Sequence, residues 1–199
     1  MLINHNSPII LASSSNIRKK ILESVGLRFE AMSPFYNEDE EKKSLTINSP
    51  AKLAVYLASQ KALSVSQKYR NTYVIGADQV CEVNGLILNK SSNKSEAIDQ
   101  LQKLNNQIHT QNNGLVIAYN NKIIFKKFSK VSLKMRKLTI QDIEKYVDCD
   151  QSFGCAGSYK YEAMGQHLFA ETKGDYYAIL GLSVQPLLNF FHSNKIISF

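Results

Sequence analysis

Residues 8–19 read PIILASSSNIRK, and this stretch decides the class of fold. A short apolar run that suits a buried strand stops at three consecutive serines. Apolar residues then recur at helical spacing as far as Gly26, a residue that commonly ends helices. The pattern predicts a strand, a polar turn and a helix, with two cations, Arg18 and Lys19, one turn into the helix.

Strands and helices continue to alternate along the rest of the chain. A helix is predicted from the Ser49-Pro50 cap to about Lys68, and an apolar strand over residues 72–77 that ends at Asp78. Further predicted elements are hairpins turning at 84–85 and 120–121, helices over 96–104 and 140–147, strands over 153–161 and 166–170, and a helix over 184–191 interrupted early by Pro186. Interleaved strands and helices predict an α/β fold, and no linker divides residues 1–199, so a single domain is expected.

Composition narrows the classes of function. The 24 Lys and Arg residues outnumber the 17 Asp and Glu residues, and a net charge of +7 favours an anionic partner such as a nucleotide, a nucleic acid or an acidic lipid. The densest basic cluster, residues 126–130, alternates with apolar residues as a solvated strand face does, and no aromatic-basic motif accompanies it. Nucleic acid is therefore the disfavoured partner.

Other classes lack their sequence signatures. Three cysteines without a C-x-x-C pair argue against a disulfide framework or a zinc knuckle, and the histidines lack zinc-protease spacing. The chain contains no G-x-S-x-G, no P-loop and no G-x-G-x-x-G. No apolar run approaches the roughly 20 residues of a membrane span, and the N-terminus does not read as a signal peptide, so we expect a cytoplasmic protein without membrane attachment.

Two segments have the chemistry of a phosphate site. Ser13, at the predicted strand–helix junction, and Arg18 suit an anion because the free N–H groups and the dipole of a helix N-terminus favour phosphate; plain N-capping by serine is the alternative. Asp78 follows a buried strand, where ligand and metal residues of α/β sheets are found, although a turn-forming aspartate would read the same. Lys90, after the hairpin, would point its ammonium group at a phosphate.

Two more segments have less specific patterns. The acidic stretch at residues 38–41 suits either a solvated loop or, beside a phosphate site, a Mg²⁺ site. Residues 155–162 combine small, aromatic and acidic side chains ending at Glu162, which suits a pocket for a nucleobase as well as it suits ordinary packing.

Taken in order, these segments resemble the Maf family of nucleoside-triphosphate pyrophosphatases, from about Leu11 to Phe191. The shared motifs are LASSS with Arg18 (the family's L-A-S-x-S-P), 57–62 (L-A-x-x-K-A), 75–78 (I-G-A-D), 89–91 (G-K-P), 156–159 (A-G-x-Y) and 181–183 (G-L-P). Gln79-Val80-Cys81 and the acid at 162 are similar to the subgroup described as 7-methyl-GTP pyrophosphatases. The chain departs from the family pattern at Asn16, Lys19, Asn89, Ser91 and Ser183.

The resemblance implies a fold and a reaction. The fold would be an elongated, twisted mixed sheet flanked by helices, with two lobes around a cleft, often as a homodimer. The reaction would be hydrolysis of a standard or modified nucleoside triphosphate to monophosphate and pyrophosphate with Mg²⁺ or Mn²⁺. Asp78 would act as general base or metal ligand, with Glu40 or Glu41 as the second acid. The substrate would be bound by Ser13, Arg18, Lys61, Lys90 and Glu162.

A second hypothesis is a regulator that binds nucleotide with little or no turnover and is linked to arrest of cell division. The altered turns around Lys90 and the positive net charge motivate it. An assay of many nucleoside triphosphates for pyrophosphate release separates the two hypotheses.

Overall fold

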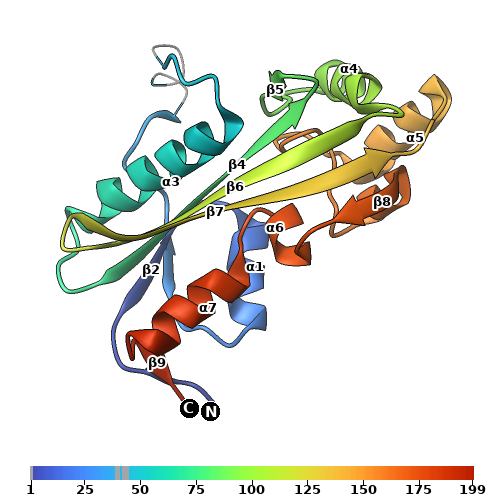
Figure 1. Ribbon diagram of the computed structural model, residues 1–199. Helices are drawn as coiled ribbons and strands as arrows, with labels where there is room; N and C mark the ends of the chain where they lie inside the picture. Colours follow the sequence, from blue (N-terminus) through green and yellow to red (C-terminus); the bar gives the residue numbers. More distant parts are fainter. Residues whose placement is uncertain (1, 39–40, 42–44) are drawn as a thin grey trace. The chain divides into compact units, whose positions relative to one another are not determined.

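The computed structural model describes residues 2–38, 41 and 45–199 (Figure 1). None of the helices in these ranges is both long and apolar enough to cross a membrane. The elements are, in chain order, β1 (Asn4–His5), β2 (Ile9–Ala12), α1 (Asn16–Ser24), β3 (Glu30–Met32), α3 (Pro50–Ser66), β4 (Tyr73–Val83), β5 (Leu86–Leu88), α4 (Lys94–Leu104), β6 (Ile108–Tyr119), β7 (Lys122–Met135), α5 (Ile140–Asp150), the 3-10 helix η1 (Met164–Leu168), β8 (Phe169–Lys173), α6 (Tyr176–Ile179), α7 (Val184–Ser193) and β9 (Ile197–Ser198).

The main sheet is mixed, which confirms the α/β prediction. Its strands follow the order β3-β2-β4-β6-β7-β8, and β5 pairs with β4. The pairs β2–β3 and β2–β4 are parallel, whereas β4–β5 and β7–β8 are antiparallel. The short strands β1 and β9 pair with each other, which brings the two ends of the chain together.

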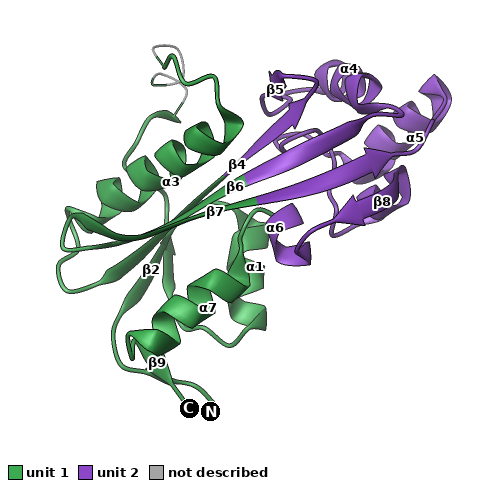
Figure 2. Cartoon of the chain, viewed as in Figure 1, with its two compact units in different colours: residues 1–78, 113–129, 181–199 green, residues 79–112, 130–180 purple. Residues whose placement is uncertain are grey.

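The chain divides into two units built from interleaved segments (Figure 2). Unit 1 comprises residues 1–78, 113–129 and 181–199, and unit 2 comprises residues 79–112 and 130–180. Strands β4, β6 and β7 contribute residues to both units. The expectation of one domain over residues 1–199 stays a prediction.

In unit 1, helix α3 lies unusually close to strands β4 and β6. A Cβ on Gly76 would lie 2.2 Å from the Ala58 carbonyl oxygen, and one on Gly114 would lie 2.3 Å from that of Ala54. Small residues at i and i+4 on the helix therefore meet glycines on the strands, so backbone approaches backbone. Lys61 lies on the same helix, so the close contact of α3 with the strands brings Lys61 near the sheet.

Helix α7 packs on the opposite face of the unit 1 sheet. Tyr73 and Phe191 make an edge contact with ring centroids 6.5 Å apart, and Phe125 lies 4.8 Å from Phe190. Val74, the next residue after Tyr73, belongs to the core beneath α3. Because successive strand side chains point to opposite faces, α3 and α7 cover the two faces of this part of the sheet.

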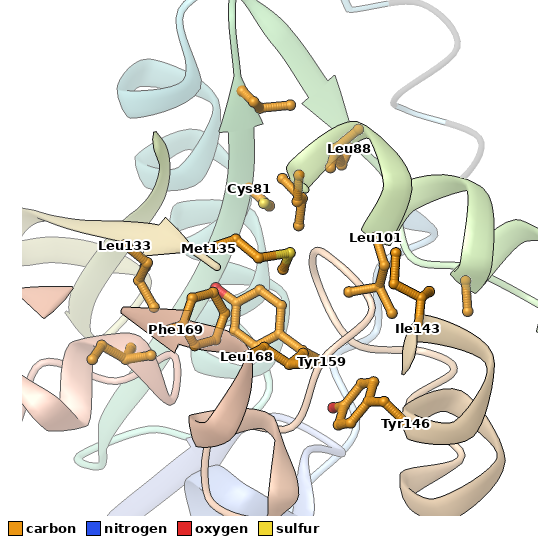
Figure 3. Close-up of a cluster of buried hydrophobic side chains, with 14 of the residues drawn as sticks. Cys81, Leu88, Leu101, Leu133, Met135, Ile143, Tyr146, Tyr159, Leu168 and Phe169 are labelled. Carbon is orange, nitrogen blue, oxygen red and sulfur yellow. The ribbon is translucent and has the colours of Figure 1, made fainter. Parts of the chain in front are cut away.

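Unit 2 has its own apolar core (Figure 3). Side chains from α4 and α5 meet those of β4, β7 and the segment around Tyr159. The Tyr159 and Phe169 rings lie 4.8 Å apart in an edge contact. The residues of this cluster are all different from those of the core under α3.

Four predicted elements differ in the structure. The strand expected over residues 166–170 begins only at Phe169 and continues to Lys173 as β8, because Met164–Leu168 form the 3-10 helix η1. Strand β4 does not end at Asp78 but continues to Val83, because it gains a new antiparallel partner in β5 and the carboxylate is neutralised by Lys61. Residues 153–161 form turns instead of a strand, since Gly154, Gly157 and Ser158 have positive φ. Pro186 does not interrupt α7, because it lies in the first turn, where a backbone N–H has no helical partner.

Candidate functional site

The N-terminus of α1 presents polar groups at the end of strand β2. Ser13 is buried, and its Oγ accepts hydrogen bonds from the Ser15 N–H at 3.2 Å and from Arg18 Nη1 at 3.4 Å. Ser15 occupies the N-cap position but makes no side-chain capping bond. The Ser15 side chain therefore does not act as an ordinary N-cap. The backbone N–H groups and the dipole at the start of α1 suit an anion.

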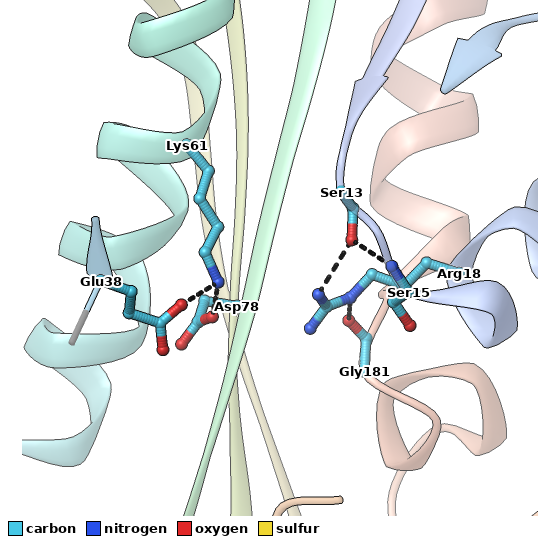
Figure 4. A network of polar contacts seen from close by, with 7 residues as sticks. All are labelled: Ser13, Ser15, Arg18, Glu38, Lys61, Asp78 and Gly181. Atoms are coloured by element: carbon cyan, nitrogen blue, oxygen red, sulfur yellow. Dashed lines mark hydrogen bonds and ion pairs between the residues drawn. The ribbon is translucent and has the colours of Figure 1, made fainter. Parts of the chain in front are cut away.

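Arg18, on α1, extends its side chain toward Gly181, another residue of unit 1. Its Nε donates to the Gly181 carbonyl oxygen at 2.9 Å (Figure 4). Burial lowers the pKa of Arg18, while the negative charges of Asp78 and Glu38 raise it. Guanidinium groups stay protonated in proteins, so a permanent positive charge faces these two carboxylates.

Lys61 joins two carboxylates from distant parts of the sequence. Its Nζ lies 2.6 Å from Glu38 Oε2 and also donates to Asp78 Oδ1 (Figure 4). Lys61 and Asp78 are 8% and 5% exposed, so both charges depend on this pairing in place of water. The pairing of β4 with β2 ends at Ile75, which leaves Asp78 just beyond the parallel segment, as Ser13 is beyond β2.

A third carboxylate lies in the same region. Glu41 accepts a hydrogen bond from the Tyr56 hydroxyl of α3. Burial raises the pKa of Tyr36, and the negative charges of Glu41, Tyr56, Glu38 and Asp78 raise it further. The other predicted second acid, Glu40, lies outside the described residues.

These groups fit a divalent cation that is shared with substrate. Glu38 and Asp78 contact the same ammonium group, so their oxygens are near each other, and Mg²⁺ is usually bound by one or two carboxylates together with phosphates and water. The described part of the chain holds no cluster of three or more His, Cys, Asp or Glu side chains that would enclose a metal ion. The pair of carboxylates therefore suits an ion bound jointly with phosphates.

Unit 2 holds Lys90 in a well-anchored turn. Lys90 is exposed and forms an antiparallel bridge with Ala156. The Gly154 N–H donates to the Ser91 carbonyl oxygen at 2.9 Å, and Gln100 Nε2 donates to the Asn89 carbonyl oxygen at 2.7 Å. Hydrogen bonds thus hold the turn in which Asn89 and Ser91 replace the family's glycine and proline.

Glu162 also belongs to unit 2. Burial raises the pKa of the Cys155 thiol, Glu162 raises it further, and Lys160 and Lys90 lower it. Lys90 pairs with Ala156, the residue after Cys155, and Glu162 lies in the turn that follows Tyr161. Glu162 itself is exposed.

Sequence reasoning missed Glu38 as a named site residue. It belongs to the acidic stretch, but composition alone ranked all four acids equally. Its sequence position, as the first acid of the stretch, did not distinguish Glu38 from the other acids. Only the fold shows that Glu38 pairs with Lys61. The structure brings Ser13, Arg18, Lys61 and Asp78 together in unit 1, and Lys90 and Glu162 both belong to unit 2.

Comparisons with known proteins support the motif resemblance. The sequence model of the family described as Maf-like protein matches residues 8–194. The chain is 35% identical over 195 residues to a Nitrobacter winogradskyi protein named nucleoside triphosphate pyrophosphatase, covering 97% of this chain and 96% of that one. A Legionella pneumophila protein of the same name is 37% identical over 190 residues, covering 96% and 95%. A solved HAM1 protein from Coxiella burnetii superposes with a TM-score of 0.44 and 11% identity, over 65% and 73% of the chains.

Proposed function

Because this chain belongs to the Maf-like protein family, we propose that it hydrolyses a nucleoside triphosphate to the monophosphate and pyrophosphate. The observation that carries the proposal is the pairing of the buried Lys61 and Asp78 with the half-buried Glu38, in the same unit as the α1 N-terminus, whose N-cap side chain makes no capping bond. Carboxylates, cations and helix N–H groups are together what the hydrolysis of a phosphoanhydride requires.

The proposed step is attack by water on the α-phosphorus. A bond forms between the water oxygen and the α-phosphorus, the bond from that phosphorus to the bridging oxygen breaks, and pyrophosphate leaves. Asp78 or Glu38 takes the proton of the water, while Lys61, Arg18 and the α1 N-terminus neutralise phosphate oxygens. Mg²⁺ or Mn²⁺, when bound, would be held by Asp78 and Glu38 and would add charge neutralisation.

We assign the substrate contacts of unit 2 to Lys90 for a phosphate and Glu162 for the edge of the base. The hydrogen-bonded turn that carries Lys90 supports the assignment of Lys90. The similarity of Gln79-Val80-Cys81 and Glu162 to the 7-methyl-GTP subgroup makes 7-methyl-GTP one member of the substrate panel. We also propose a cytoplasmic location and a homodimer, as the resemblance implies.

The alternative of a nucleotide-binding regulator with little turnover is not favoured. One of its two motives was the altered residues around Lys90, and hydrogen bonds hold that turn in place; the other, the positive net charge, suits an enzyme acting on nucleotides equally well. The relatives at 35% and 37% identity are named as enzymes, and the similarity extends over nearly their whole length.

The test is a panel of standard and modified nucleoside triphosphates, with Mg²⁺ or Mn²⁺, scored for pyrophosphate release. We expect Asp78→Asn to lower turnover by about 100-fold or more, because it removes a carboxylate while keeping the shape of the side chain. Asp99→Asn, an exposed site on α4, is the matched control and should keep full turnover. Normal turnover by Asp78→Asn would exclude Asp78 from the reaction, and a panel without pyrophosphate release would refute the proposed function.

A further inference from the structure

Strand β6 contains an unusual run of buried polar residues. His109 to Asn113 are each between 1% and 9% exposed, in a strand that continues with the apolar residues 115–118. Burying polar side chains costs free energy unless they are hydrogen-bonded, so an ordinary core strand would carry apolar residues here. The hydrogen bonds of these side chains therefore indicate the role of the run.

Gln111 connects this strand to the turns at 152–159. Its Nε2 donates to the Ala156 carbonyl oxygen at 3.0 Å and to the Tyr159 hydroxyl at 2.7 Å. The same hydroxyl lies 3.0 Å from His109 Nε2. Both amide hydrogens of Gln111 are thus used on one segment of chain, and both partners lie within the Ala156–Tyr159 motif.

That segment depends on such contacts because its backbone has little regular structure. Gly154, Gly157 and Ser158 have positive φ, and its regular pairing is the bridge between Ala156 and Lys90. A second tie comes from Ser158, whose Oγ lies 3.0 Å from Ser91 Oγ and donates to Gln100 Oε1 at 2.8 Å. Gln111 secures the segment to the sheet, and Ser158 secures it to the turn that carries Lys90.

We propose that Gln111 is a positioning residue for Lys90, acting through the Ala156 backbone. The Ala156 carbonyl is held by Gln111, and Ala156 in turn pairs with Lys90, so the amide sets the place from which the ammonium group reaches a phosphate. This inference rests on the proposed function, in which Lys90 binds the phosphates of the substrate.

The experiment is a double-mutant cycle between positions 111 and 90. Gln111→Met keeps the length of the side chain and removes both hydrogen bonds, whereas Lys90→Ala removes the phosphate contact. We would measure the affinity for inorganic tripolyphosphate, which needs no base, together with KM and kcat for the best nucleotide of the panel. Gln111→Met should weaken tripolyphosphate binding and raise KM by about five-fold, the effect of losing one useful hydrogen bond, with kcat nearly unchanged.

In the Lys90→Ala background, Gln111→Met should have no further effect on either quantity. Additive effects, or unchanged binding by Gln111→Met alone, would overturn the role of Gln111. If Lys90→Ala itself leaves tripolyphosphate binding unchanged, the assigned role of Lys90 is wrong, which is a separate failure.

Two further variants separate positioning from general packing. Asn112→Leu changes the next buried residue, whose Nδ2 donates to the Val80 carbonyl oxygen and to Thr110 instead of the 152–159 turns. It should leave tripolyphosphate affinity at the wild-type level. Ser158→Ala removes the second tie and should weaken binding in a Lys90-dependent way even if Gln111→Met fails to fold; Lys90-independent weakening would contradict the proposal.

Discussion

Acid should destabilise the protein through His109, which is buried as a neutral imidazole in unit 2. Its Nε2 lies 3.0 Å from the Tyr159 hydroxyl, and its ring contacts the rings of Tyr159 and Phe169. Burial lowers the pKa of His109 from 6.5 to about 4, and the charge of Glu82 opposes this shift only in part. Protonation would place a charge in an apolar core, so the folded state resists it.

The magnitude follows from the difference between the two pKa values. Between pH 6.5 and pH 4 the unfolded chain binds a proton at His109 and the folded chain does not. This contribution to stability is therefore intact above pH 6.5 and is lost progressively as the pH falls. At pH 5 the loss from His109 is about 2 kcal/mol, and at pH 4 it is about 3 kcal/mol.

The assay is urea unfolding followed by far-UV circular dichroism, at pH 7 and at pH 5, for the wild type and for His109→Gln. The variant has no imidazole to protonate, so its stability should fall by about 2 kcal/mol less than that of the wild type over this interval. Comparing the two proteins cancels the other titrating groups. An equal fall in both proteins would refute the reasoning, and so would an NMR titration that gives His109 a pKa near 6.5.

Three further perturbations test the packing and the local structure. Lys61→Met leaves the Glu38 and Asp78 carboxylates without their shared cation, so unfolding should become easier by about 3 kcal/mol, measurable as a lower Tm; an unchanged Tm would contradict the buried pairing. Gly76→Ala places a Cβ 2.2 Å from the Ala58 carbonyl oxygen, and forcing α3 outward should cost about 3 kcal/mol in urea unfolding, whereas a wild-type midpoint would show that α3 is not in close contact. Thr139→Ala removes the capping box that Thr139 forms with Asp142 at the start of α5 and should cost about 1 kcal/mol, and calorimetry showing no change would argue against this cap.

Elements with strong local signals could be predicted from sequence. The capping box at Thr139, the Asn84-Gly85 turn and the Asn120-Asn121 turn each act within a few residues, and the structure shows the cap and the positive φ values that these patterns predict. The segment 153–161 was mispredicted because its aromatic residues suit a strand, while its glycines and Ser158 adopt turn conformations held by contacts to Ser91 and the sheet. Long-range contacts outweighed local preference there.

The candidate site shows the same division. Ser13, Arg18, Lys61 and Asp78 were predicted from motifs, because charge and spacing along the chain are visible in the sequence. The partner of Lys61 could not be predicted in this way, since four acids in succession are chemically alike. The selection of Glu38 depends on where that segment lies beside α3.

By itself, the sequence determined the alternation of strands and helices, their caps and turns, and the family to which the chain belongs. Only the tertiary structure decided that Lys61 pairs with both Glu38 and Asp78, that strand β4 continues through Asp78, and that Gln111 holds Ala156. The physical reason is distance along the chain. Caps, turns and periodicity act between near neighbours, whereas a buried charge is stabilised by whichever partner the packing of α3 against Gly76 and Gly114 brings to it.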